Sequence, residues 1–266
     1  MLQFHNPDIP VYGIYGGESQ NLQTCRKKLE KYFKNLWIIP EWLSDAKWSN
    51  FETILKVWYS RIGKDIDFDR AYIIEWDLLL LDSLENIYHN IGINEVGVTG
   101  LIPVDKIKNK WYWSTDESQK RKLEYVFSLA KQYYNHHSLF YASLGPGLCF
   151  PKSYLENFAK LNLPTICHEE IYFPLFAQLF NYSLKDTGFF NGWFDDKERR
   201  YFNCEKKYIS KKTIRTEFLL HGRKVFHPYQ KQFLRINPIE KAIFIICRKI
   251  KRIIFYKKQE LSLCSK

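Results

Sequence analysis

The sequence lacks the cysteine patterns of a zinc site and of a disulfide-stabilised fold. Its six cysteines are spread over 266 residues, include no CxxC pair and follow no regular spacing. Structural zinc sites and disulfide frameworks both use characteristically spaced cysteines. We therefore expect free thiols in a protein of a reducing compartment.

Long hydrophobic runs and export signals are also missing. The apolar run from Leu78 to Leu81, for example, ends at Asp82, whereas a membrane-spanning helix needs about 20 mostly apolar residues. The first eight residues carry neither the basic segment nor the apolar core of a signal peptide. These absences predict a cytoplasmic protein without a transmembrane segment.

The composition is that of a globular protein with an excess of positive charge. Hydrophobic residues make up 45% of the chain and aromatic residues 17%, which is ample for a packed core. The 40 Lys and Arg residues outnumber the 29 Asp and Glu residues, so the formal net charge is +11. This charge favours phosphorylated ligands, nucleic acid or an anionic membrane surface, and it does not choose among them.

Short apolar segments alternate with segments of helical spacing over the first 80 residues. Such alternation predicts an α/β fold with a mainly parallel sheet flanked by helices. Because no repeat or low-complexity linker interrupts the chain, we expect one catalytic-sized domain at 1–237 and a C-terminal extension at 238–266. The predicted strands are 10–15, 36–39 and 71–77, and the predicted helices between them are 22–33 and 51–61.

Two carboxylates stand at the end of the third predicted strand, in the sequence Glu75-Trp76-Asp77. Alternate residues of a strand share a face, so we expect both side chains to project together from the strand's carboxyl end. Open α/β sheets bind ligands at that edge. Mg²⁺ and Mn²⁺ are held by carboxylates together with substrate phosphates. The alternative is that the two acids only cap the strand or face solvent.

Four separated segments resemble nucleotide-sugar-dependent glycosyltransferases with the GT-A fold, a Rossmann-like α/β fold. Their order along the chain is that of the family, and together they cover about residues 10 to 230. Glu75-Trp76-Asp77 resembles the DxD metal motif with Glu in the first position. The other three segments are Tyr12 to Gly17 at the nucleotide-contacting edge, His168-Glu169-Glu170 at a helix start, and Lys224 to Pro228 with its late histidine.

The resemblance implies a divalent cation, Mn²⁺ or Mg²⁺, on the donor diphosphate. Asp77 is implied as a direct metal ligand and His227 as a second, while Glu75 would contact the ribose or a metal-bound water. An imidazole among oxygen ligands suits Mn²⁺ better than Mg²⁺. The alternative for His227 is a histidine that caps the turn before Pro228.

Donor and acceptor contacts are implied in the same way. Tyr15, Gly16 and Gly17 would contact the nucleotide, although an ordinary β-turn also explains the glycines. Glu170 is implied as the general base of an inverting transfer, with Glu169 as its neighbour. The alternative for both acids is a favourable interaction with the positive helix N-terminus.

Further candidate contacts to sugars come from a glycine-rich segment and from tryptophans. Gly145-Pro146-Gly147 falls where the family carries acceptor-side or donor-sugar loops. Trp111, Trp113 and Trp193 are candidate platforms for pyranose rings, and core packing is the alternative for each.

The C-terminal extension has the pattern of a basic amphipathic helix. Residues 239–258 contain seven Lys or Arg and one Glu, and isoleucines recur there at steps of three and four. Such a helix can lie in a membrane interface with its cations near anionic headgroups. The segment therefore predicts a peripheral position at the cytoplasmic membrane face. The alternative is a helix docked on the catalytic domain or on a second subunit.

Three functions remain to be compared. The first is a metal-dependent glycosyltransferase that moves a sugar from a nucleotide-diphosphate sugar to a glycan or lipid-linked acceptor. The second is a nucleotidyltransferase that makes sugar nucleotides, for which Gly16-Gly17-Glu18-Ser19 is a poor match to the expected glycine-rich loop. The third is a basic nucleic-acid-binding module. Because the positive charge is concentrated in the tail, we expect no nucleic-acid partner.

Overall fold

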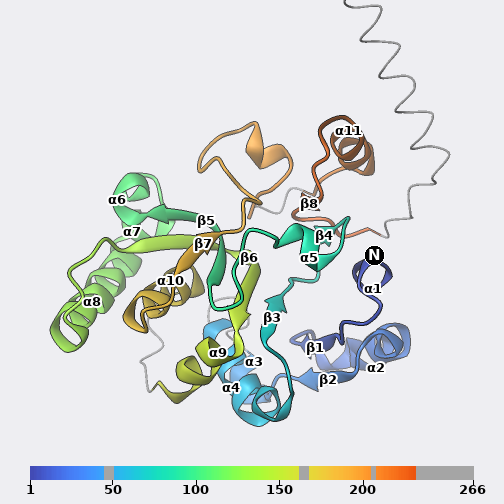
Figure 1. Ribbon diagram of the computed structural model, residues 1–266, viewed down its shortest axis with the longest axis horizontal. Helices are drawn as coiled ribbons and strands as arrows, with labels where there is room; N and C mark the ends of the chain where they lie inside the picture. The colour runs from blue at the N-terminus through green and yellow to red at the C-terminus, as the bar shows by residue number, and fades with distance from the viewer. Residues whose placement is uncertain (45–50, 162–167, 205–207, 232–266) are drawn as a thin grey trace, which may run out of the picture.

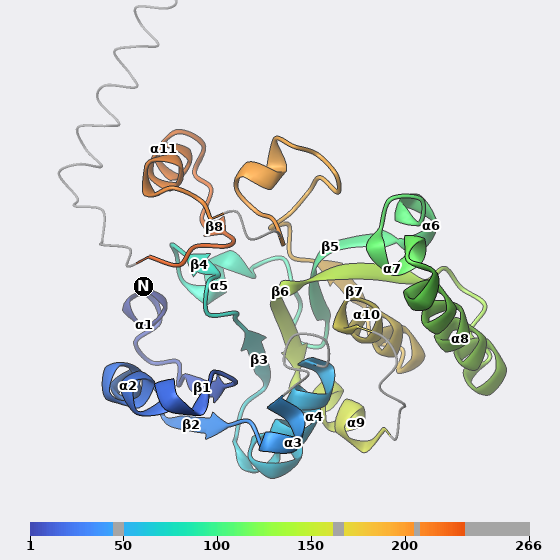
Figure 2. The ribbon, with the colours of Figure 1, turned by 180° about the vertical axis from the view of Figure 1, so that it is seen from behind.

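The protein has the predicted α/β architecture (Figure 1). Helix α10 (Glu169–Leu179) packs on a four-stranded sheet, with α8 (Glu117–Tyr134) at the same end of the molecule, while α2 (Ser19–Leu29) lies at the opposite end, in both the front and back views (Figures 1 and 2). Two short two-stranded sheets accompany it. The computed structural model describes residues 1–44, 51–161, 168–204 and 208–231.

The main sheet is mixed, which corrects the prediction of a mainly parallel sheet. Its strand order is β3-β6-β5-β7. Strand β6 runs antiparallel to both of its neighbours, and only β5 and β7 pair in parallel. Consequently β3, β5 and β7 point the same way, and β6 is reversed between them. The bounds are β3 Arg70–Ile73, β5 Val96–Pro103, β6 Tyr141–Pro151 and β7 Leu184–Asp186.

The reversed strand follows from the route of the chain between β5 and β6. Helix α6 (Val104–Ile107) begins directly after β5, and the Val104 N–H donates to the Phe140 carbonyl (2.9 Å), immediately before β6. The intervening helices α7 (Tyr112–Thr115) and α8 thus return the chain to the point from which it left. Strand and helix alternation predicts a parallel pair only when the helix carries the chain back to the start of the previous strand.

Strands β1 (Tyr12–Tyr15) and β2 (Asn35–Ile38) form a parallel pair of their own, connected by α2 and a short 3₁₀ helix. The pair lies next to β3 in both views without joining its sheet (Figures 1 and 2). Apolar side chains of the pair, including Ile14 and Trp37, pack against the main core. The predicted strand–helix–strand unit at the N-terminus is therefore present as a separate small sheet.

The third sheet pairs two short strands from distant parts of the sequence. Strand β4 (Leu79–Leu80) runs antiparallel to β8 (Val225–Phe226), with Leu79 opposite Phe226. A cluster of buried apolar residues lies behind the pair and includes Ile214 of α11 (Lys211–His221). The other face of the pair is buried as well, because Leu80 and Val225 pack in a second apolar cluster, so packing on both faces holds β8 against β4.

The main core is aromatic and lies where helices pack on the sheet. Phe150 of β6, Tyr154 and Phe158 of α9 (Lys152–Lys160), and Phe173 of α10 are buried and in ring contact. Helix α4 (Phe51–Arg61), predicted from its spacing, packs on α9 and α10. The remaining helices are α1 (Leu2–His5), α3 (Glu41–Ser44) and α5 (Leu84–Ile87), with short 3₁₀ turns at Gly63–Asp65 and Glu198–Arg200.

The predicted amphipathic segment at 239–258, and with it the extension at 238–266, lies outside the described residues. Among the residues that the structure does describe, no helix is both long enough and apolar enough to cross a membrane.

Candidate functional site

The acidic pair lies in a turn and not in a strand. Strand β3 ends at Ile73, and the Leu78 N–H donates to the Glu75 carbonyl (3.0 Å), which closes a tight turn before β4. The strand predicted to run through Asp77 is therefore too long. Glu75 and Asp77 still face the same point, but the turn brings them together, and strand alternation does not.

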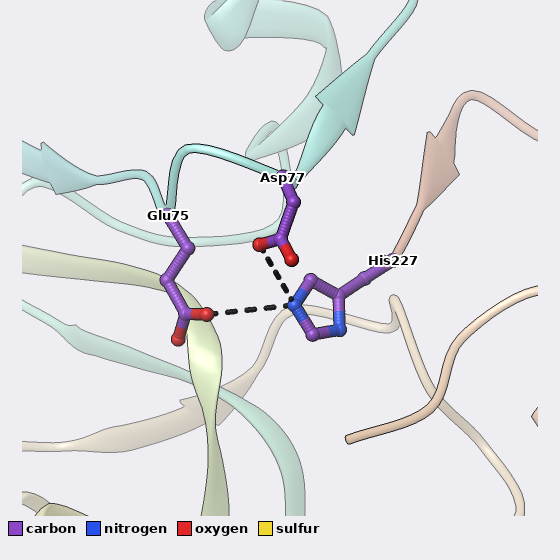
Figure 3. Close-up of side chains that lie close together, drawn as sticks. All are labelled: Glu75, Asp77 and His227. Atoms are coloured by element: carbon purple, nitrogen blue, oxygen red, sulfur yellow. Dashed lines mark ion pairs between the residues drawn. The ribbon is translucent and has the colours of Figure 1, made fainter. Parts of the chain in front are cut away.

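His227 completes this group from the other end of the chain (Figure 3). Its Nε2 lies 3.3 Å from Asp77 Oδ1 and 3.4 Å from Glu75 Oε2. The β4–β8 pairing places His227 here, and the Tyr229 N–H extends the pairing by donating to the Asp77 carbonyl (2.8 Å). The structure thus brings together Asp77 and His227, the two residues that the resemblance implied as metal ligands, and it adds Glu75 as a third possible ligand.

The backbone of Asn203 fixes the orientation of the His227 ring. His227 Nδ1 lies 2.6 Å from the Asn203 carbonyl, and a carbonyl only accepts, so Nδ1 carries a proton and donates. Nε2 is then the nitrogen directed at the two carboxylates. Burial lowers the pKa of His227, but hydrogen bonds and charge interactions with Asp77 and Glu75 outweigh burial and raise it to about 9.

The donor set fits a hard or borderline divalent cation. Each of Glu75, Asp77 and His227 offers one ligand atom, and these atoms all lie within 4.8 Å of one another. Asp77 Oδ1 is buried and faces His227 Nε2 at 3.3 Å, and a buried carboxylate is costly without a cationic partner. A histidine whose second nitrogen is held by a backbone carbonyl is typical of metal ligands. Two carboxylates with one imidazole suit Mn²⁺.

A second group of acids stands at the N-terminus of α10. His168 is the N-cap, and its Nδ1 accepts from the Glu170 N–H (3.4 Å). His168 Nε2 lies 3.0 Å from Glu169 Oε2. Glu169 is only 6% exposed, and burial, with the nearby charge of Glu170, raises its pKa well above the ordinary value. Glu169 is thus directed inward at His168.

Glu170 points elsewhere and is held by an indole. Its Oε2 accepts a hydrogen bond from Trp113 Nε1 (2.8 Å). Burial raises the pKa of Glu170 to about 7, while hydrogen bonds from Trp113 and Trp111 lower it and the charge of Glu75 raises it further. A carboxylate whose pKa is near 7 is suited to general-base work at neutral pH.

The two acidic groups belong to one site, and Gly145 lies between them. A Cβ atom on Gly145 would lie 3.1 Å from Glu169 Oε1 and 3.3 Å from Glu75 Oε1. Gly145 belongs to β6, in the stretch where the pairing register with β5 shifts. The predicted role of Gly145-Pro146-Gly147 as a loop is therefore wrong, since the segment is part of a strand, although Gly145 does reach the site.

The predicted nucleotide-binding residues make local contacts. The Tyr15 hydroxyl donates to the Glu18 carbonyl (2.9 Å), and a Cβ atom on Gly17 would collide with the Tyr15 ring at 2.5 Å. Gly16 follows β1 directly. Tyr15, Gly16 and Gly17 therefore form a compact turn at the end of β1, and their role toward a nucleotide stays a prediction.

The tryptophans divide between core and site. Trp111 is buried in the main core, and it also hydrogen-bonds to Glu170. Trp193 donates from Nε1 to the Gly100 carbonyl (2.7 Å) and packs edge-on against Trp111. Trp113 donates from its N–H to Glu170 Oε2, and its ring in addition stacks on His168 with centroids 4.5 Å apart.

Two residues of the site were not identified from the sequence. Asn203 acts through its backbone carbonyl, which leaves no sequence signal. Glu52 of α4 is 5% exposed, its Oε2 has no hydrogen-bond partner, and burial raises its pKa to about 7. Its charge also raises the pKa of Glu169. A glutamate at the apolar face of a predicted helix was the available signal for Glu52.

Comparison with protein-family models finds no match, and comparison with curated proteins finds none either. The functional argument therefore depends on the geometry of the site.

Proposed function

We propose that this protein is a metal-dependent glycosyltransferase of GT-A type, which moves a sugar from a nucleotide-diphosphate sugar to a glycan or lipid-linked acceptor. The observation that carries the proposal is the convergence of Glu75, Asp77 and His227 on one point. The buried oxygen of Asp77, which faces His227 Nε2 at 3.3 Å, supports a cation at that point. A cation there would neutralise the charge that grows on the diphosphate as the sugar leaves.

The acids of α10 supply the acceptor side of the proposed reaction. Glu170 accepts the proton of the acceptor hydroxyl while that oxygen forms a bond to the anomeric carbon. The bond from the anomeric carbon to the diphosphate oxygen breaks, and its electron pair leaves with the nucleoside diphosphate. Because attack is opposite to the leaving group, the product has inverted configuration. Glu169, buried against His168, is the poorer candidate for the base.

Two further segments take part in the proposed reaction, the turn after β1 and the C-terminal extension. Tyr15, Gly16 and Gly17 contact the nucleotide, and residues 239–258 bring the enzyme to an anionic membrane surface where a lipid-linked acceptor would be found. The strand direction shared by β3, β5 and β7 supports a GT-A type sheet, because the acidic turn then follows a strand at its carboxyl end.

The decisive experiment changes Asp77→Asn and measures binding and turnover of nucleotide sugars with Mn²⁺. The substitution keeps the size of the side chain and removes its charge. We expect the variant to fold, as judged by circular dichroism, and to lose both the Mn²⁺-dependent thermal shift with UDP or GDP and any sugar transfer. A ligand that binds only the folded state raises apparent stability, by about 2.7 kcal/mol at 100 times its dissociation constant.

The matched control is Asp105→Asn, which removes one negative charge from an exposed pair with Lys108. It should behave as the wild type in both assays. If Asp77→Asn retains the Mn²⁺-dependent shift, or if neither protein shows one with any nucleotide, the proposed function is wrong.

A further inference from the structure

Trp113 connects helix α7 to the N-terminus of helix α10, which carries Glu169 and Glu170. Trp113 lies on α7, and its indole N–H donates to Glu170 Oε2 (2.8 Å). The same ring is stacked on His168, with centroids 4.5 Å apart and an angle of 25° between planes. One side chain therefore contacts both the N-cap residue of α10 and the second acid of its first turn.

Helix α7 is anchored in the main core directly beside this contact. Trp111 at its N-cap is 5% exposed and packs in the main core. Its carbonyl accepts hydrogen bonds from the Ser114 N–H (3.0 Å) and from the Thr115 hydroxyl (3.0 Å). A side chain presented from a core-anchored turn loses little conformational freedom when it binds, so it is suited to fix a functional group.

From this geometry we infer that Trp113 is a positioning residue that holds Glu170 in one orientation toward the acceptor. The inference rests on the proposed function for the base role of Glu170. Without Trp113, the Glu170 carboxylate would lose a charge-assisted hydrogen bond and gain rotamer freedom. The stacked ring adds a second constraint, because it keeps His168 over the first turn of α10, where its Nδ1 accepts from the Glu170 N–H.

The titration of Glu170 reports on this contact, since the hydrogen bond from Trp113 acts directly on the Glu170 carboxylate. The hydrogen bond from Trp113 favours the charged form of Glu170, so its loss should raise the pKa. Among the described residues, the other groups that act on Glu170, or on which it acts, include Trp111 at the N-cap of α7, Glu75 of the β3–β4 turn, His168 and Glu169 at the start of α10, and Cys204.

The test is a ¹³C NMR titration of the glutamate carboxyls in the full-length, metal-free protein, with Glu170 assigned through Glu170→Gln. Wild-type Glu170 should titrate near pH 7. Trp113→Phe keeps an aromatic ring over His168 but lacks the N–H, and it should raise this pKa by about one pH unit. Trp193→Phe is the matched control, because it also removes one indole N–H bond, that to Gly100, and should leave the titration of Glu170 unchanged.

Replacement of Trp113 by benzothienylalanine, which has a sulfur in place of the N–H and nearly the same shape, gives the same measurement if Trp113→Phe does not fold. An unmoved Glu170 pKa in the substituted protein, or an equal change in Trp193→Phe, overturns the inference. Once a donor that the enzyme uses is known, kcat/KM for the acceptor can be measured against pH. The pKa of the acidic limb of that profile should be higher in Trp113→Phe than in the wild type. Mn²⁺-dependent nucleotide binding, which Trp113→Phe should retain, tests the proposed function separately.

Discussion

The pH dependence of stability in the metal-free protein provides a quantitative test of the Glu75–Asp77–His227 group. His227 has a pKa of about 9 in the folded chain, against an ordinary value of 6.5. The perturbation is His227→Gln, which keeps a polar side chain of similar length that does not titrate. The comparison is made in EDTA, so that no divalent cation competes with the protonated imidazole for the two carboxylates.

The sign and size of the effect follow from linkage. Between pH 6.5 and about 9 the folded state keeps a proton on His227 that the unfolded state has lost. The stabilisation from His227 is therefore complete below pH 6.5 and disappears as the pH rises through 9. A difference of 2.5 pH units corresponds to about 3 kcal/mol of unfolding free energy, as an upper bound.

The assay is urea denaturation of both proteins at pH 6 and pH 9.5. The wild type should lose about 3 kcal/mol more than His227→Gln over this interval, since other titrating groups are common to both. Equal losses in the two proteins would refute the assignment of a shared proton to this group. Saturating Mn²⁺ should remove the difference in slope, because a bound cation replaces the proton on Nε2.

Two glycines of β6 should separate function from stability. In Gly145→Ala the new methyl meets the carboxylate ends of Glu75 and Glu169. We therefore expect near-wild-type thermal stability, and an affinity for Mn²⁺ that calorimetry shows to be about tenfold weaker. Unchanged Mn²⁺ affinity would argue against a metal site at this point. In Gly147→Ala the Cβ would lie 2.7 Å from the Phe189 ring, and the backbone φ is +83°. Urea denaturation should therefore show that the free energy of unfolding falls by about 2–4 kcal/mol. A fall of less than about 1 kcal/mol would contradict the packing argument.

Local sequence signals were reliable where a single element carries them. Helix α4 was expected at 51–61 and spans Phe51–Arg61, because its apolar residues recur at helical spacing. Helix α8 begins at Glu117 directly after Asp116, a favoured N-cap residue, which accepts from the Ser118 and Gln119 N–H groups (3.0 Å each). Propensity and capping act within one or two turns, so sequence is sufficient to place such elements.

Pairing between distant segments was harder to predict. The spacing of strands and helices does not reveal where a helical excursion ends, so the reversal of β6 was missed. Glu75 and Asp77 were expected to lie together because alternate residues of a strand share a face. They do face the same point, but a turn and not a strand brings them there. His227 was named only by resemblance, because nothing near Phe226 in the sequence indicates that β8 pairs with β4.

The amino-acid sequence by itself determined the α/β class, the main helices and the chemical types available for a site, because these depend on periodicity, capping and composition. Tertiary structure alone decided which acids meet which bases. It placed His227 against Asp77, aimed its Nε2 through the Asn203 carbonyl, and set Trp113 on Glu170. Those contacts join residues far apart in the chain, and their geometry depends on the packing of whole elements, which no local pattern encodes.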